Sequence, residues 1–410
     1  MTSPGSHDML SNVDQTVRRP PIIAAYAAFV LVGISAGVGG VLLPAQIVDY
    51  GVNKATVGIT FFTFSAGFML AGATAGPLLH RIGTRRTLAF GASLFALAGI
   101  YTGVRPPFVV YVIVVQTVMG YGIGLLESVL NAFLSTQSDA TTLLNRLHAF
   151  FGVGALLGPV LAASMLTSVA WTTVLLALGL ACVPLAAIFG TMYPTHPVAM
   201  HAVDATYGEA PPLPSRGLLS TALHDPGVML GAVFLAVYVG LEIGVGTWGF
   251  SLMVGHYGQK AVLAGYTISG YWLGLTVGRF VISAVVRRFG MTAANMTTAC
   301  LLGIAASAAL AWVAPDATLA GVGLALLGFC LGPIFPTTMS LVPRLTSSRL
   351  VPTAIGVING FSVIGGAVCS WLAGAIAQGV GVWTLLPFAL ALALVLLAIW
   401  WRLARRITTA

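Results

Sequence analysis

Apolar residues run through this chain in long stretches that short polar turns interrupt. A transmembrane helix needs about 20 apolar residues in succession, because a rise of about 1.5 Å per residue must cross about 30 Å of hydrocarbon. The pattern predicts twelve such helices, at roughly residues 22–45, 56–79, 87–104, 107–134, 147–168, 170–193, 227–252, 262–286, 292–313, 317–341, 352–377 and 382–401.

The longest interruption of this pattern holds five prolines among polar residues, which is typical of a linker. It divides the predicted helices into two groups of six. The expected organisation is an N-terminal tail (1–21), an N-terminal six-helix half (22–193), a linker (194–225), a C-terminal six-helix half (226–401) and a C-terminal tail (402–410).

Composition agrees with a chain that lies mostly in lipid. Of 410 residues, 58% are hydrophobic and only 7% are charged, whereas a soluble domain carries about 25% charged residues. This excludes a soluble enzyme and a nucleic-acid-binding domain. The four cysteines lie in apolar runs without metal-ligand spacing, and we expect neither a metal nor another cofactor. We therefore expect an all-α, multi-pass protein of the cell membrane.

The basic residues predict how the helices are oriented. With the N-terminus inside, the cytoplasmic segments carry fourteen Lys and Arg residues, whereas the outer loops carry three. Basic residues concentrate on the cytoplasmic side of membrane proteins. Both termini are therefore predicted to be cytoplasmic, and the net charge of +8 reflects topology rather than nucleic-acid binding.

The two halves repeat each other in sequence. Gly33, Gly37 and Gly39 match Gly240, Gly244 and Gly246 at an offset of 207 residues, and the same offset matches Gly58 with Gly265 and Gly67 with Gly274. Because both halves begin on the cytoplasmic side, the repeats are parallel, and an axis along the membrane normal should relate them.

This repeat, together with one cytoplasmic turn, resembles the major facilitator superfamily. The turn Gly76-Pro-Leu-Leu-His-Arg-Ile-Gly-Thr-Arg-Arg86 is similar to the G-x-x-x-D-R-x-G-R-R signature of that family, with His80 at the place of the usual Asp. The resemblance implies a major facilitator fold and a role in the cytoplasmic gate for Gly76, Arg81, Gly83, Arg85 and Arg86. The alternative is that these arginines only anchor the topology.

Three charged residues lie inside predicted helices: Glu127, Glu242 and Arg279. A charge near the bilayer centre costs at least about 2.5–3.5 kcal/mol, so such residues usually have a function. A desolvated carboxyl group can bind and release a proton near neutral pH, which predicts proton coupling at Glu127 and Glu242. Two alternatives remain: Glu127 serves as a structural hydrogen-bonding residue, and Glu242 pairs with Arg279 as a fixed strut.

Polar and aromatic side chains inside the helices are candidates for substrate binding. Amides hydrogen-bond sugar hydroxyls, and aromatic rings cover the apolar faces of sugars. Asn131 lies one turn from Glu127 and shares its helix face. His148 could relay protons or bind substrate, and Trp248 could instead lie at the membrane interface. The candidates are Gln116, Asn131, His148, Trp248, Tyr271, Trp272 and Asn359.

Two further motifs resemble the fucose–galactose–glucose/H⁺ symporter family. They are Gly122-Ile-Gly-Leu-Leu-Glu-Ser-Val-Leu-Asn-Ala-Phe133 and Tyr238-Val-Gly-Leu-Glu-Ile-Gly-Val-Gly-Thr-Trp248. The resemblance implies proton coupling and sugar binding at Glu127 and Asn131. A helix 1 aspartate of that family corresponds to about Gly40 here, so Glu127 couples alone, Glu242 takes the second role, or transport is not driven by protons.

The sequence therefore predicts a secondary active transporter, not an enzyme. It would move a small neutral solute, with a sugar the first candidate, together with protons by alternating access. Na⁺ is the alternative coupling ion, and efflux of drugs or metabolites is the alternative function. We expect a lipid-embedded monomer that does not bind nucleic acid.

Overall fold

The computed structural model describes residues 19–137, 139–193 and 217–409, and every regular element within them is helical. The expected tail up to residue 18 and the linker residues 194–216 lie outside the described residues. The N-terminal half contains α1 (Arg19–Tyr50), α2 (Lys54–Val57), α3 (Ile59–Thr102), α4 (Phe108–Val110), the π-helical η1 (Tyr111–Val115), α5 (Gln116–Ser135), α6 (Ala140–Met165) and α7 (Trp171–Met192).

The C-terminal half begins with a short helix that leads into the first long one. Its elements are α9 (Leu218–His224), α10 (Pro226–Gly255), α11 (Ala261–Phe289), α12 (Ala293–Trp312), α13 (Ala317–Leu331), α14 (Ile334–Leu341), the 3₁₀ helix η2 (Val342–Arg344), α15 (Val351–Gly379), the 3₁₀ helix η3 (Val382–Thr384) and α16 (Leu385–Thr409).

Ten helical segments of the described chain are long and apolar enough to cross a membrane. One of them contains α3, whose 44 residues would span about 66 Å as a straight helix, about twice the hydrocarbon thickness. The helix kinks at Gly83, where φ is 79° and a left-handed backbone favours glycine. Counting α3 as two spans and adding α11, with its 29 residues, would give the predicted twelve.

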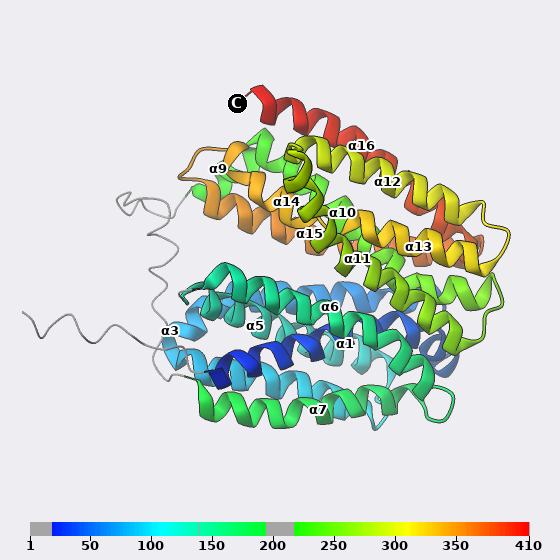
Figure 1. The fold of residues 1–410 in the computed structure, drawn as a ribbon. Coiled ribbons are helices and arrows are strands. Elements are labelled where there is room, and N and C mark those ends of the chain that lie inside the picture. The colour runs from blue at the N-terminus through cyan, green and yellow to red at the C-terminus, as the bar shows by residue number, and fades with distance from the viewer. Residues whose placement is uncertain (1–18, 138, 194–216, 410) are drawn as a thin grey trace, which may run out of the picture.

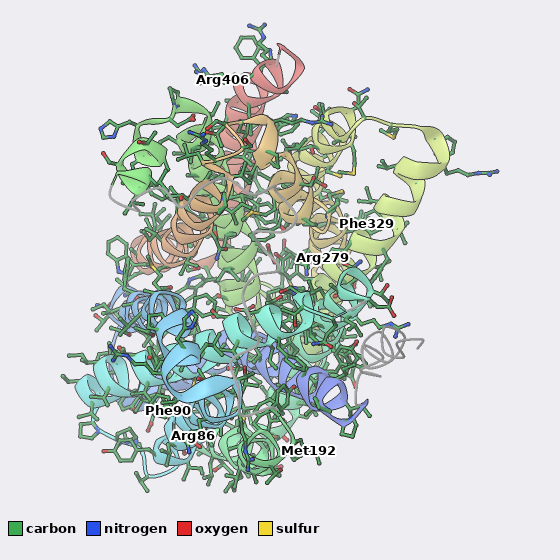
Figure 2. All side chains as sticks on the ribbon, turned by 90° about the vertical axis from the view of Figure 1, so that its left-hand side faces the viewer. Arg86, Phe90, Met192, Arg279, Phe329 and Arg406 are labelled. Carbon is green, nitrogen blue, oxygen red and sulfur yellow. The ribbon has the colours of Figure 1, made fainter. Side chains whose placement is uncertain are left out.

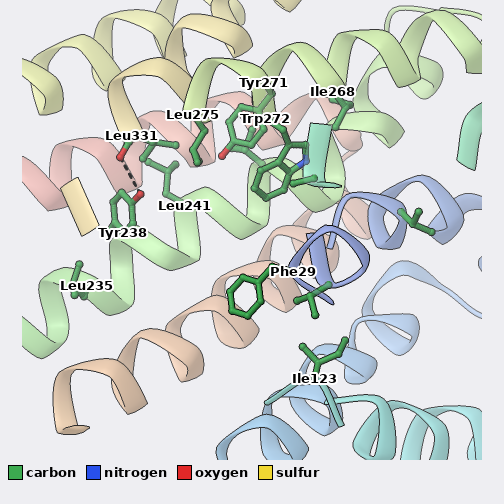
Figure 3. Packing of buried hydrophobic residues seen from close by; sticks show 14 of the residues in the cluster. Phe29, Ile123, Leu235, Tyr238, Leu241, Ile268, Tyr271, Trp272, Leu275 and Leu331 are labelled. Carbon is green, nitrogen blue, oxygen red and sulfur yellow. Dashed lines mark hydrogen bonds between the residues drawn. The ribbon is translucent and has the colours of Figure 1, made fainter. Parts of the chain in front are cut away.

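The helices form two groups that lie side by side, and the same pairings recur in both (Figure 1). In the N-terminal half α1 packs on α6, and α3 packs on α5 and α7. In the C-terminal half α10 packs on α15, α11 packs on α13, and α12 packs on α16. These pairings correspond element by element, as the sequence repeat requires. A continuous cluster of buried apolar side chains fills both groups (Figure 3).

The start of α1 and the C-terminal end of α16 lie at the same end of the molecule (Figure 1). We call the opposite end, where α1 ends and α10 ends, the far end. The two halves meet mainly where α6 packs on α11, α1 on α10, and α15 on α3. Helix order and packing thus agree with the two parallel repeats expected from the sequence.

A brace of polar and aromatic side chains fixes the far end of the N-terminal half. Asp49 at the end of α1 accepts hydrogen bonds from Arg105 Nε at 2.7 Å and from Trp171 Nε1 at 2.9 Å. Tyr50 donates its hydroxyl to the carbonyl of Pro106 at 2.9 Å. Three segments, the end of α1, the turn before α4 and the start of α7, are thereby tied together.

A second polar cluster fixes the start of α10. Asp225 caps this helix by accepting hydrogen bonds from the backbone N–H groups of Gly227 at 2.8 Å and Val228 at 3.2 Å, and from the Thr346 hydroxyl at 2.7 Å. Burial raises the pKa of the Asp225 carboxyl, but these hydrogen bonds outweigh the burial and hold the pKa below its usual value. The cap therefore joins α10 to the segment between η2 and α15.

We expect Asp225→Ala to destabilise the protein by about 1 kcal/mol or somewhat more, because it removes both the cap and the bond to Thr346. Since the folded-state pKa lies below the unfolded value, the stabilisation is present at neutral pH and is lost as pH falls through the folded-state pKa. Thermal unfolding in detergent across acidic pH measures this. Asp316→Ala is the matched control, because Asp316 caps α13 through one bond, to Leu319 N at 2.9 Å. An equal loss in both variants would contradict the expectation.

Candidate functional site

An ion pair joins two helices of the C-terminal half, α10 and α11. Glu242 is near the middle of α10, and its Oε1 is 3.7 Å from Nη2 of Arg279 on α11. The side chains are 11% and 26% exposed, respectively. Figure 2 shows Arg279 between the two halves when the molecule is viewed from the end that carries the termini. The structure thus pairs Glu242 with Arg279, the alternative that the sequence left open.

The predicted helix 317–341 is broken, and the break reaches this ion pair. Pro333 lies between α13 and α14. A proline has no backbone N–H, and its ring clashes with the preceding turn of a helix, so the helix is interrupted here. Pro336 lacks the N–H that would bond the carbonyl of Gly332 four residues earlier. Nε of Arg279 donates to that carbonyl instead, at 3.3 Å. The guanidinium therefore holds both a carboxylate oxygen and a carbonyl that the helix leaves unbonded.

Tyr238 begins one of the sequence motifs but was not among the predicted site residues. Its hydroxyl donates to the carbonyl of Leu331 at 3.0 Å, also at the end of α13 (Figure 3), and lies beside the carboxyl group of Glu242. Tyr238 and Glu242 are four residues apart, which is one helical turn. A signal was present in the sequence: Gly332, Pro333 and Pro336 predict unbonded carbonyls, which need donors from neighbouring helices.

The predicted aromatic ligands Trp248, Tyr271 and Trp272 lie on α10 and α11 of the C-terminal half. The Tyr271 hydroxyl donates to the backbone carbonyl of Glu242 at 2.8 Å, and the ring of Trp272 lies edge-on to that of Tyr271 (Figure 3). Trp248 donates its indole N–H to the Ser370 carbonyl at 2.8 Å. All three aromatic side chains are buried. Of the three, Tyr271 contacts the backbone of the ion-paired Glu242, and substrate binding by these residues stays a prediction.

His148 interacts electrostatically with a residue of the other half. It lies on α6 in the N-terminal half, close enough to Arg279 of α11 for the two side chains to interact electrostatically. It is exposed, although its ring packs edge-on against Phe29 with ring centres 5.6 Å apart. An accessible imidazole between helices fits either predicted role, proton relay or substrate binding.

Glu127 and Asn131 lie together on α5 in the N-terminal half. Both are half-buried, and Nδ2 of Asn131 donates to the backbone carbonyl of Glu127 at 2.7 Å. Among the described residues no Lys, Arg or His forms an ion pair with Glu127. The two intramembrane carboxylates therefore differ: Glu242 is paired with a cation, and Glu127 is not paired within the described chain.

The remaining predicted residues lie on helices other than α10 and α11. Gln116 begins α5, where it interacts with the Tyr111 hydroxyl, and Asn359 is exposed on α15. In the predicted gate motif Gly83 forms the kink of α3, and Arg85 donates to the carbonyl of Gly190 on α7. Gly76 is half-buried, and Arg81 and Arg86 are exposed; Figure 2 labels Arg86 in the N-terminal half. A gate function for this motif stays a prediction.

Two parallel helical halves, with charged residues where they meet and a broken helix beside those charges, are typical of a polytopic membrane carrier. The model of the Major Facilitator Superfamily matches residues 25–367, and the chain belongs to that family. The resemblance to this superfamily is thereby confirmed, and the narrower resemblance to the fucose–galactose–glucose/H⁺ symporter family stays a prediction. The family consists of transporters, which are not enzymes.

Relatives of this chain carry several descriptions. Bypass of stop codon protein 6 of Saccharomyces cerevisiae is 24% identical over 88% of this chain and 78% of its own length. The gallate transporter of Pseudomonas putida is 27% identical over 38% of each chain. Among solved structures, the nucleoside transporter NupG superposes with a TM-score of 0.77 at 13% identity, covering 94% of this chain and 99% of that one. The E. coli fucose:proton symporter FucP has a TM-score of 0.59 at 17% identity, covering 93% and 97%.

Proposed function

We propose that this chain is a secondary active transporter of the cell membrane that moves a small neutral solute, with a sugar the first candidate, together with protons. Glu127 carries the proposal: it is an intramembrane carboxylate without an ion-pair partner among the described residues. Such a group can change its protonation without breaking a salt bridge. FucP, a structural neighbour that is described as a sugar:proton symporter, supports the choice of solute and ion.

The surroundings of Arg279 support protons rather than Na⁺. A sodium ion in a transporter of this kind would be coordinated by carboxylate oxygens and by carbonyls of a broken helix. Here the guanidinium of Arg279 already holds a Glu242 oxygen and the Gly332 carbonyl. Because Arg279 is a permanent cation, it takes the place that a coupling cation would need at this point.

Transport follows from movement of the two halves about a site between them. His148 on α6 and the Glu242–Arg279 pair in the other half face this region. A change in the charge of His148 therefore alters its electrostatic interaction with Arg279. We propose that the solute binds near these residues and near Glu127 and Asn131, and that protonation of Glu127 accompanies its passage.

Proteoliposomes with a pH-sensitive dye test this function. We expect D-glucose, L-fucose or D-xylose added outside to cause alkalinisation of the outer medium, because symport carries protons inward with the sugar. Protein-free liposomes and liposomes made permeable to protons are the controls. Absence of a response to all sugars, together with a response to gallate or ethidium, would contradict the proposal. It would favour transport of metabolites or drugs, which the relationship to the gallate transporter supports as the second candidate.

A further inference from the structure

Helices α1 and α10 cross at Gly40 with almost no space between their backbones. A Cβ atom on Gly40 would lie 2.8 Å from Cα and 2.9 Å from the carbonyl carbon of Thr247, and closer still to the Thr247 carbonyl oxygen. Separations this short are not tolerated between carbon atoms. Because all three colliding atoms belong to the backbone, no change of side-chain rotamer at Thr247 would relieve the collision. Only glycine permits this crossing.

The crossing lies at equivalent positions of the two repeats. Gly40 and Thr247 are separated by 207 residues, the same offset that matches Gly33 with Gly240 and Gly39 with Gly246. Two equivalent positions of parallel repeats come into contact only on the axis that relates the repeats. The backbones of the two halves therefore touch on this axis, in the part of α1 and α10 that leads to the far end.

Other contacts between the halves surround this crossing. The backbone N–H of Lys54 donates to Oε1 of Gln378 at 3.0 Å, and the rings of Phe61 and Trp248 lie edge-on, 6.4 Å between centres. Gly58 approaches the ring of Trp371, where an added Cβ would lie 3.1 Å from Cδ1. All of these residues lie towards the far end, so the conformation described here is closed there.

We propose that Gly40 is a gate residue whose missing side chain allows the far end to close. A methyl group at this position keeps α1 and α10 apart and holds the halves in a conformation that is open at the far end. The proposal rests on the function proposed above, because closing and opening at one end is what a transporter of this kind requires. The role of Gly40 is therefore to permit contact between the two halves, rather than to permit packing within its own half.

Three glycines of α1 provide matched variants. Gly40→Ala collides with the other half, Gly39→Ala has no atom within 4 Å of the added Cβ, and Gly33→Ala collides with its own half at Ala155 N, 2.9 Å away. We expect Gly39→Ala to behave like the parent protein. Gly33→Ala should lower the melting temperature, because it disrupts packing of α1 on α6. Gly40→Ala should fold with a melting temperature close to that of Gly39→Ala and change only the arrangement of the halves.

The arrangement is measured by electron–electron double resonance between spin labels at positions 48 and 380 in a cysteine-free background, with the protein in lipid nanodiscs. Val48 on α1 and Val380 after α15 are 81% and 62% exposed and belong to different halves. We expect the parent and Gly39→Ala to show a short-distance population. Gly40→Ala should lose most of it and gain distances several ångströms longer.

Two outcomes would overturn the proposal. One is a Gly40→Ala protein that keeps the distance distribution of the parent. The other is a Gly40→Ala protein that unfolds as Gly33→Ala does, since that would make the crossing part of the folded core rather than a gate. The measurement needs no substrate and no proton gradient. A failed search for sugar:proton transport would therefore leave its result standing.

Discussion

Glu127→Gln is expected to abolish uphill accumulation of the solute while leaving exchange of solute across the membrane. One pH unit across the membrane can drive about tenfold accumulation per proton, because a factor of ten in a ratio corresponds to about 1.4 kcal/mol. A glutamine has nearly the same shape as the glutamate but cannot bind the transported proton. The variant should therefore let the solute reach equal concentrations on both sides and no more.

This expectation is checked with radiolabelled solute, once the proteoliposome experiment has identified it. Accumulation is measured under an imposed pH gradient, and counterflow exchange is measured without one. Glu127→Asp is the matched control, because it keeps a titratable carboxyl on the same face of α5, and it should retain some accumulation. Normal uphill transport by Glu127→Gln would remove Glu127 from proton coupling.

Glu242→Gln is expected to destabilise the protein more than Arg279→Gln. A carboxyl group that loses its cation can neutralise itself by taking up a proton, whereas a guanidinium stays charged. The cost of removing Glu242 should stay below the roughly 3–5 kcal/mol of a fully buried pair, because the Arg279 side chain is 26% exposed. The bond from Arg279 to the Gly332 carbonyl remains in that variant and reduces the cost further.

A double-mutant cycle separates the pair from its surroundings. The double variant Glu242→Gln, Arg279→Gln should melt at a higher temperature than Glu242→Gln alone, because it leaves no uncompensated charge between the helices. The order of melting temperatures, measured at neutral pH in one detergent, shows whether the Glu242–Arg279 contact contributes to stability. Strictly additive losses would show that the 3.7 Å contact does not contribute to stability.

Much of the architecture could be predicted because lipid imposes a simple rule on the sequence. Helices must be long and apolar, and the predicted span 170–193 encloses the observed α7, Trp171–Met192. The rule says less about where a helix bends. The predicted spans 56–79 and 87–104 lie in one helix that kinks at Gly83, and the predicted span 317–341 is divided beside Pro333. A kink depends on local backbone chemistry, which hydropathy does not record.

The site was predicted in part, and the missing part concerns contacts between helices. Rarity of charge alone identified Glu127, Glu242 and Arg279. Their relation could not be derived, because the pairing of Glu242 with Arg279 depends on how α10 and α11 rotate against each other. The sequence also did not show that the indole N–H of Trp248 would donate a hydrogen bond to the Ser370 carbonyl. Such partners are fixed by packing between residues far apart in the chain.

The brace at the far end of the N-terminal half has a mechanical consequence. Asp49, Arg105 and Trp171 tie the end of α1 to the turn before α4 and to the start of α7. A displacement of α1 at its crossing with α10 would therefore be transmitted to the turn before α4 and to the start of α7. We therefore expect this half to move as one body when α1 is displaced at Gly40. Removing the hydrogen bonds of Asp49 would make this half less rigid without changing the contact at Gly40.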